Sequence, residues 1–124
     1  MKFLSFLASI LIAINPPSDF LCDGELLTAT IRNNLNGDFS VVSNLEQIDQ
    51  GAFVVINWKK INLMLPVSFQ SGEISFTDKK WLWSYQDNER GLHEDSPRFV
   101  QRLQNGEFVE YSCNSFEHDK KKLA

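Results

Sequence analysis

The stretch Ser71–Gln86, SGEISFTDKKWLWSYQ, decides the fold class of this chain. It contains two of the three tryptophans, Trp81 and Trp83, directly after a turn signal at Thr77–Lys80. In a strand, side chains two residues apart point to the same face, so Trp81, Trp83 and Tyr85 would all point the same way. The pattern predicts a β-hairpin with one aromatic face.

Strand patterns continue on the N-terminal side of this hairpin. Leu26–Arg32 alternates apolar and polar residues, which is typical of a strand with one face in a core. Ala52–Trp58 is the most apolar segment after the N-terminus and predicts a strand that is buried on both faces or central in a sheet. Ile61–Leu65 would return as its partner and end at Pro66, because proline lacks the N–H needed to continue a ladder.

Turn signals separate the expected strands. Asp23–Gly24 favours a tight turn after the strand that ends at Cys22, and Lys59–Lys60 turns the chain after Trp58. Asn105–Gly106 suits a two-residue type I′ turn. It would join strands at Phe99–Gln104 and Glu107–Cys113.

The segment between Phe39 and Gln50 is harder to assign. Phe39–Val42 is a candidate short strand. Ser43 with Glu46 three residues later matches a capping box, which predicts one helical turn.

These signals give about seven to eight strands with turns every eight to twelve residues, the spacing typical of a small antiparallel β-barrel or sandwich. With 124 residues the chain makes one domain. We expect an all-β fold over residues 16–113, followed by a flexible polar tail at 114–124. The net charge of −4 argues against a phosphate-backbone ligand, so nucleic acid is not an expected partner.

The N-terminal segment Met1–Asn15 has one lysine and then an almost unbroken apolar run. A run of this length with a basic start fits a helical signal segment and is too short to span a bilayer. We therefore expect export to a periplasm or the extracellular space, with no integral membrane span after cleavage. An uncleaved anchor and a core strand are the alternatives.

The chain has two cysteines, Cys22 and Cys113. They are too few for a structural zinc site and are not spaced as a redox pair. In an exported protein they favour a disulfide that would close a loop of roughly 90 residues, and two independent buried thiols are the alternative.

Residues for catalysis are scarce. His93 and His118 are the only histidines, and each lies in a polar, acidic context without an evident nucleophile. A metal site at His93, Glu94 and Asp95 is disfavoured because adjacent residues in a strand point to opposite faces. We therefore expect surface histidines, no cofactor, no metal and no enzymatic activity.

Two features suggest binding. The face formed by Trp81, Trp83 and Tyr85 is either core or a recognition surface for a glycan or protein. Lys79 and Lys80 at the hairpin tip are either solvated turn residues or a basic tip that enters an acidic cleft.

Taken together, the motifs resemble the membrane-bound or periplasmic inhibitors of c-type lysozyme. The resemblance rests on a set of residues spread along the chain: Cys22, Leu65–Pro66, Ser71–Gly72, a turn near Asp78, Trp81, Trp83 and Cys113. It implies an eight-stranded barrel closed by a disulfide between the first and last strands.

The resemblance also implies a site. Ser71, followed by Gly72, matches the family serine that points into the lysozyme cleft. The family lysine after the strand tryptophan is not matched, because Ser84 follows Trp83. Lys79 or Lys80 would then supply the positive charge. The expected function is an exported inhibitor that inserts a loop into the cleft, and the alternative is an envelope or secreted binding module that uses its tryptophan-rich face.

Overall fold

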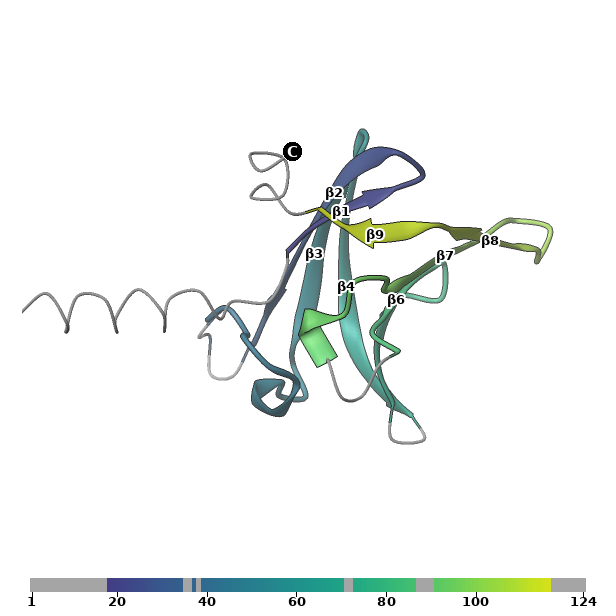
Figure 1. The fold of residues 1–124 in the computed structure, drawn as a ribbon. Coiled ribbons are helices and arrows are strands. Elements are labelled where there is room, and N and C mark those ends of the chain that lie inside the picture. Colours follow the sequence, from purple (N-terminus) through teal and green to yellow (C-terminus); the bar gives the residue numbers. More distant parts are fainter. Residues whose placement is uncertain (1–17, 35–36, 38, 71–72, 87–90, 117–124) are drawn as a thin grey trace, which may run out of the picture.

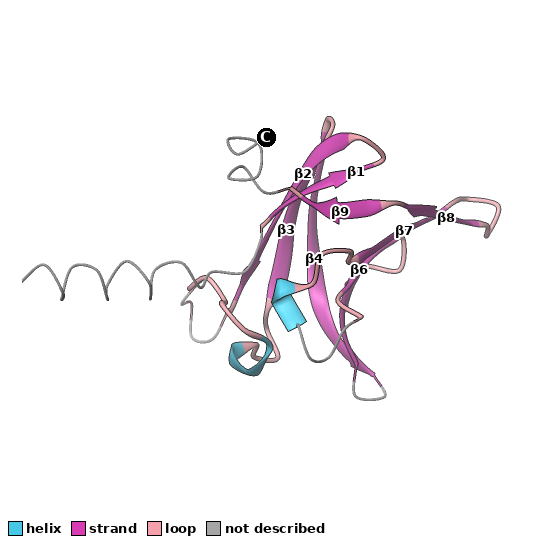
Figure 2. Cartoon of the chain, viewed as in Figure 1, coloured by secondary structure: helices cyan, strands magenta, loops and turns pink. Residues whose placement is uncertain are grey.

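The computed structural model describes residues 18–34, 37, 39–70, 73–86 and 91–116. In these residues the protein is all-β, with nine antiparallel strands in a nearly closed barrel (Figure 1, Figure 2). The strands are β1 Asp19–Cys22, β2 Glu25–Arg32, β3 Phe53–Trp58, β4 Ile61–Gln70, β5 Glu73–Thr77, β6 Trp81–Ser84, β7 Arg98–Arg102, β8 Phe108–Tyr111 and β9 Cys113–Ser115. The predicted signal segment, Met1–Asn15, lies outside the described residues.

Two short 3₁₀ helices, η1 Leu45–Gln47 and η2 Gly91–His93, lie in the connections between strands. Within the described ranges, no helix is long and apolar enough to cross a membrane.

The barrel closes through one bent segment at the end of the domain. From β1 to β8 each strand pairs with its neighbours in the chain, and β9 returns to pair with β1. Ser112 separates β8, which pairs with β7, from β9, which pairs with β1. A disulfide joins Cys22 to Cys113, which face each other across the β1–β9 pair. The predicted disulfide is confirmed, and it ties the first strand to the last.

The predicted aromatic hairpin is present as β5 and β6, and its rings fill the core. Trp81, Trp83 and Tyr85 are 6%, 0% and 7% exposed. The interpretation of this face as a recognition surface is therefore wrong. A barrel of this size has an interior just wide enough to be filled by side chains, and large rings bury the most apolar area there.

Tyr85 provides a pH-dependent prediction. Burial raises the pKa of Tyr85 above its ordinary value of 10.0, and the charge of Glu94 acts in the same direction, while the Trp83 side chain partly opposes the shift. Above pH 10 the unfolded chain loses this proton while the folded protein keeps it, so the free energy of unfolding falls by up to about 1.4 kcal/mol per pH unit. Well below pH 10 the Tyr85 hydroxyl is protonated in both states, so its titration takes nothing from the free energy of unfolding.

We expect Tyr85→Phe to remove this alkaline slope. Urea unfolding of the parent protein and the variant at pH 8 to 11 measures it. As the pH rises above 10, the free energy of unfolding of the parent should fall relative to that of the variant, and a constant difference between the two across that range would contradict the prediction.

Strand β4 does not end at Pro66 as predicted but continues to Gln70. Pro66 lies opposite Phe53, and the ladder bond next to it runs from the Val67 N–H to the Ala52 carbonyl. The missing N–H of Pro66 therefore points to the other side of β4, where pairing with β5 begins only at Val67. Proline is tolerated because no ladder bond is required of it there.

The Asn105–Gly106 turn is also one residue longer than predicted. The Leu103 N–H donates to the Glu107 carbonyl at 2.8 Å, so the loop holds the three residues between them. Gly106 has a φ of 87°, and Asn105 is not in the left-handed region. This arrangement matches a three-residue hairpin loop with glycine in the left-handed position.

Three further predictions differ from the structure. Phe39–Val42 is not a strand, because only an isolated bridge joins Val41 to Arg32. The helical turn is capped by Asn44, whose Oδ1 accepts from the Gln47 N–H, and not by Ser43. The last strand runs to Ser115, so the barrel takes in part of the segment predicted as a tail.

Candidate functional site

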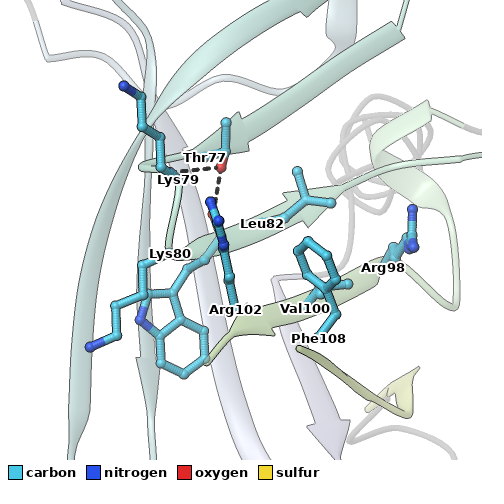
Figure 3. Close-up of a pocket in the computed structure, with 9 residues that line it drawn as sticks. Thr77, Lys79, Lys80, Leu82, Arg98, Val100, Arg102 and Phe108 are labelled. Carbon is cyan, nitrogen blue, oxygen red and sulfur yellow. Dashed lines mark hydrogen bonds between the residues drawn. The ribbon is translucent and has the colours of Figure 1, made fainter. Parts of the chain in front are cut away.

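An open groove of about 340 Å³ lies on the outer face of the barrel across β5 to β8 (Figure 3). Its lining combines basic and apolar side chains: Thr77, Lys79, Lys80, Trp81, Leu82, Arg98, Val100, Arg102 and Phe108. We call it the cationic groove.

The β5–β6 turn that carries the two lysines is held by side-chain hydrogen bonds. Asp78 Oδ1 accepts from the N–H groups of Lys80, at 2.9 Å, and Trp81, at 2.8 Å. Thr77 Oγ1 donates to the Trp81 carbonyl at 2.7 Å and accepts from the Lys79 N–H at 3.1 Å. These bonds satisfy the backbone of the turn and fix its shape.

This fixed turn holds Lys79 in an unfavourable backbone conformation. Lys79 has a φ of 78°, in the left-handed region, which costs a residue with a Cβ of the order of 1 kcal/mol. Lys59, in the β3–β4 turn, has a φ of 55° and lies outside the cationic groove. Figure 3 shows the Lys79 and Lys80 side chains pointing in different directions from the tip.

The alternation of side-chain direction along β7 places Arg98 and Arg102 in the groove. Phe99 is buried in the barrel, so Arg98, Val100 and Arg102 point to the outer face. Phe108 lies opposite Arg102 on β8 and is 71% exposed. The Phe108 ring lies between Arg98 and Arg102 in Figure 3. An apolar patch is thus bordered by guanidinium groups.

The charge of the groove differs from that of the molecule. Four basic side chains line it, although the chain has a net charge of −4. Arg98 pairs with Glu110 at 3.5 Å, but both side chains are about half exposed, so the pair is weak. Guanidinium groups match carboxylates in geometry, and a field of one sign concentrates ligands of the opposite sign. The groove therefore suits an acidic ligand with some apolar surface.

Predicted and observed site residues overlap in part. Lys79 and Lys80 lie at the exposed hairpin tip, as predicted. Ser71 and Gly72 lie outside the described residues. Among the described residues, no group of three or more His, Cys, Asp or Glu side chains could hold a metal ion. His93 is exposed.

Arg98, Arg102 and Phe108 were not predicted as site residues from the sequence. Arg98, Val100 and Arg102 follow one another at every second residue, so strand alternation alone predicts that these three side chains share one face. The pairing of β7 with β6 is what brings that face beside the Lys79–Lys80 turn. The Arg102 N–H donates to the Lys80 carbonyl at 2.7 Å.

A second hollow, of about 470 Å³, has no charged lining residue. It is lined by Asn34, Phe39, Gly51, Ala52, Phe53, Met64 and Pro66. Asn34 has the one polar side chain in this lining, whereas five polar or charged side chains line the cationic groove. Because a binding site uses placed polar groups to orient its ligand, the cationic groove is the better candidate.

Fold and groove together define a small disulfide-closed β-barrel with one basic groove on its outer face. The chain belongs to a family described as a domain of unknown function, DUF8671, whose model matches residues 30–113. The matched span includes β3 to β8 and therefore the whole cationic groove. Neither the curated proteins nor the solved structures contain a match.

Proposed function

We propose that this protein is an exported binding protein that holds an acidic protein partner in the cationic groove. The observation that carries the proposal is the gathering of four basic side chains and the exposed Phe108 around one groove of a net-acidic chain. Arginine and aromatic side chains are enriched at binding hot spots. Acidic side chains elsewhere on the molecule would repel an acidic partner, so the groove also orients that partner.

Export is part of the proposal. The Met1–Asn15 pattern supports it, and so does the disulfide between Cys22 and Cys113, since disulfides persist in oxidising compartments. The partner would therefore be met in a periplasm or outside the cell.

A c-type lysozyme is the first specific partner to test. The resemblance to lysozyme inhibitors is supported by a barrel whose first and last strands are joined by a disulfide. The Lys79–Lys80 turn is exposed and held by hydrogen bonds, which suits insertion into a cleft that contains carboxylates. Inhibition would follow if this turn blocked substrate from those carboxylates.

We expect Lys79→Gly to weaken inhibition in a cell-wall lysis assay about fivefold, because it removes one charge from the groove. Lys59→Gly is the matched control. It also removes one lysine with a positive φ from a turn, and it should leave inhibition unchanged. Glycine accepts a positive φ, so Lys79→Gly should not lower the melting temperature.

Lys59 makes one contact that Lys79 lacks among the described residues. Its Nζ lies 4.4 Å from the centre of the Trp58 ring, so Lys59→Gly should be the less stable of the two variants. Equal loss of inhibition in both variants would contradict a role for the groove. Absence of inhibition by the folded, disulfide-bonded parent protein would exclude lysozyme as the partner.

A further inference from the structure

Strand β8 presents an open backbone edge beside the cationic groove. In an antiparallel pair, residues alternate between bonding their partner strand and pointing away from it. At the start of the β7–β8 ladder, the Leu103 N–H donates to the Glu107 carbonyl, toward β8. The Arg102 N–H donates to the Lys80 carbonyl, on the β6 side of β7. By this alternation the N–H and C=O groups of Phe108 and Glu110 point away from β7.

At the next residue of this edge, Ser112, the backbone groups are hydrogen-bonded within the protein. The Ser112 carbonyl accepts from the Asp23 N–H at 2.8 Å, and the Ser112 N–H donates to Asp23 Oδ1 at 2.9 Å. Asp23 belongs to the β1–β2 turn, where β1 has already ended. In the described part of the chain, no strand continues along β8 beyond this point. Figure 1 shows the β7–β8 hairpin extending away from the rest of the barrel.

The open edge and the groove share a residue. Phe108 lines the groove and belongs to the edge, and Arg102 lies directly opposite it on β7. Glu110, the other edge residue, lies opposite Val100 and pairs with Arg98. A strand added beside β8 would therefore run along the rim of the groove.

We propose that an extended acidic segment of the protein partner adds as a strand to the open edge of β8. This inference rests on the proposed function, since it assigns the way in which the acidic partner binds. The backbone groups of Phe108 and Glu110 supply the main-chain hydrogen bonds, as in other cases of strand addition. The groove supplies selectivity for acidic side chains.

The spacing of the arginines defines the segment. Arg98 and Arg102 are four residues apart on one strand face, which is about 13 Å. Carboxylates four residues apart in the added strand would match them. The residue midway between the carboxylates would lie at the level of Val100 and Glu110, so an uncharged side chain there avoids repulsion by the Glu110 carboxylate. A second copy of this chain fits less well, because two cationic grooves would then lie at one junction.

The proposal is tested by removing an N–H from the edge without disturbing the β7–β8 ladder. Glu110→Pro does this, because the Glu110 N–H points away from β7 and proline is tolerated at such edge positions. Glu110→Ala is the matched control, since it removes the same carboxylate and the Arg98 pair but keeps the N–H.

The probe is a fluorescently labelled synthetic peptide with Glu, Val and Glu at alternate positions, separated by threonine. We expect Glu110→Pro to bind it about tenfold more weakly than the parent protein in fluorescence anisotropy. Glu110→Ala should bind as tightly as the parent or more tightly, because Arg98 is then released. The same peptide with N-methyl groups on the bonding side of its backbone should lose binding to the unmodified protein, which tests the edge even if Glu110→Pro fails to fold.

The outcomes separate this inference from the proposed function. If Arg102→Glu abolishes binding of the peptide but Glu110→Pro and N-methylation do not, the groove binds acidic ligands and strand addition is wrong. If the parent protein does not bind the peptide, strand addition is wrong, and the lysis assay still tests the groove separately. If the parent is a dimer that Glu110→Pro converts to a monomer, the edge belongs to a second copy and the proposal is overturned.

Discussion

Phe99→Ala is expected to lower the free energy of unfolding by about 3–5 kcal/mol. Phe99 is fully buried, and its ring lies 5.3 Å from Trp58, 5.3 Å from Trp81, 5.7 Å from Trp83 and 5.4 Å from Tyr111, measured between ring centres. Truncation removes its apolar contacts and leaves a cavity between rings that are held by their own strands. Aromatic pairs add about 0.5–1.5 kcal/mol each beyond area, so the loss should lie toward the upper end.

Phe108→Ala is the matched control for this variant. Phe108 is the same residue type on the neighbouring strand, but its side chain is 71% exposed. Its replacement should change the free energy of unfolding by no more than about 0.5 kcal/mol. Urea unfolding monitored by tryptophan fluorescence measures both. Similar losses in the two variants would mean that the ring cluster around Phe99 is not the core of the barrel.

Removal of the disulfide is expected to cost about 2–5 kcal/mol. Replacing both Cys22 and Cys113 by alanine avoids leaving a single free thiol. The sequence separation of 91 residues makes the entropic gain from the cross-link large, because it restricts most of the unfolded chain. A loss of this size is a large fraction of the stability of a small domain.

The disulfide also has a local effect that can be measured separately. The β1–β9 pairing covers three residue pairs, one of which is Cys22 with Cys113. Without the cross-link, we expect β9 to open before the rest of the barrel. Hydrogen exchange at the Phe116 N–H, which donates to the Asp19 carbonyl at 2.9 Å, reports this opening. Unchanged exchange there, with unchanged stability in urea, would contradict the prediction.

Local patterns were sufficient for the class of fold and for much of the strand order. The alternation at Leu26–Arg32 correctly predicts which side chains are buried, because side-chain direction in a strand depends only on sequence spacing. The turn at Asp23–Gly24 is confirmed, with φ values of 50° and 81°. Two cysteines in a chain with an export pattern were enough to favour the disulfide.

Predictions from the sequence were wrong where the effect of a residue depends on its pairing with a neighbouring strand. Pro66 was expected to end a strand, yet the direction of its missing N–H is set by the register of β3 and β4. The length of the turn at Asn105–Gly106 was likewise set by the pairing of Arg102 with Phe108. Such pairing is not encoded in a few adjacent residues, so the local signal alone could not decide it.

For the candidate site, local sequence patterns were enough to predict that Lys79 and Lys80 lie at a hairpin tip and that Trp81, Trp83 and Tyr85 share a face. Strand pairing across the whole barrel was needed to show that this face points into the interior. The same pairing brings the lysines together with Arg98, Arg102 and Phe108 in one groove. The physical reason is that spacing along a strand fixes which side chains point the same way, whereas closure of the sheet fixes which face becomes the interior and which distant residues become neighbours.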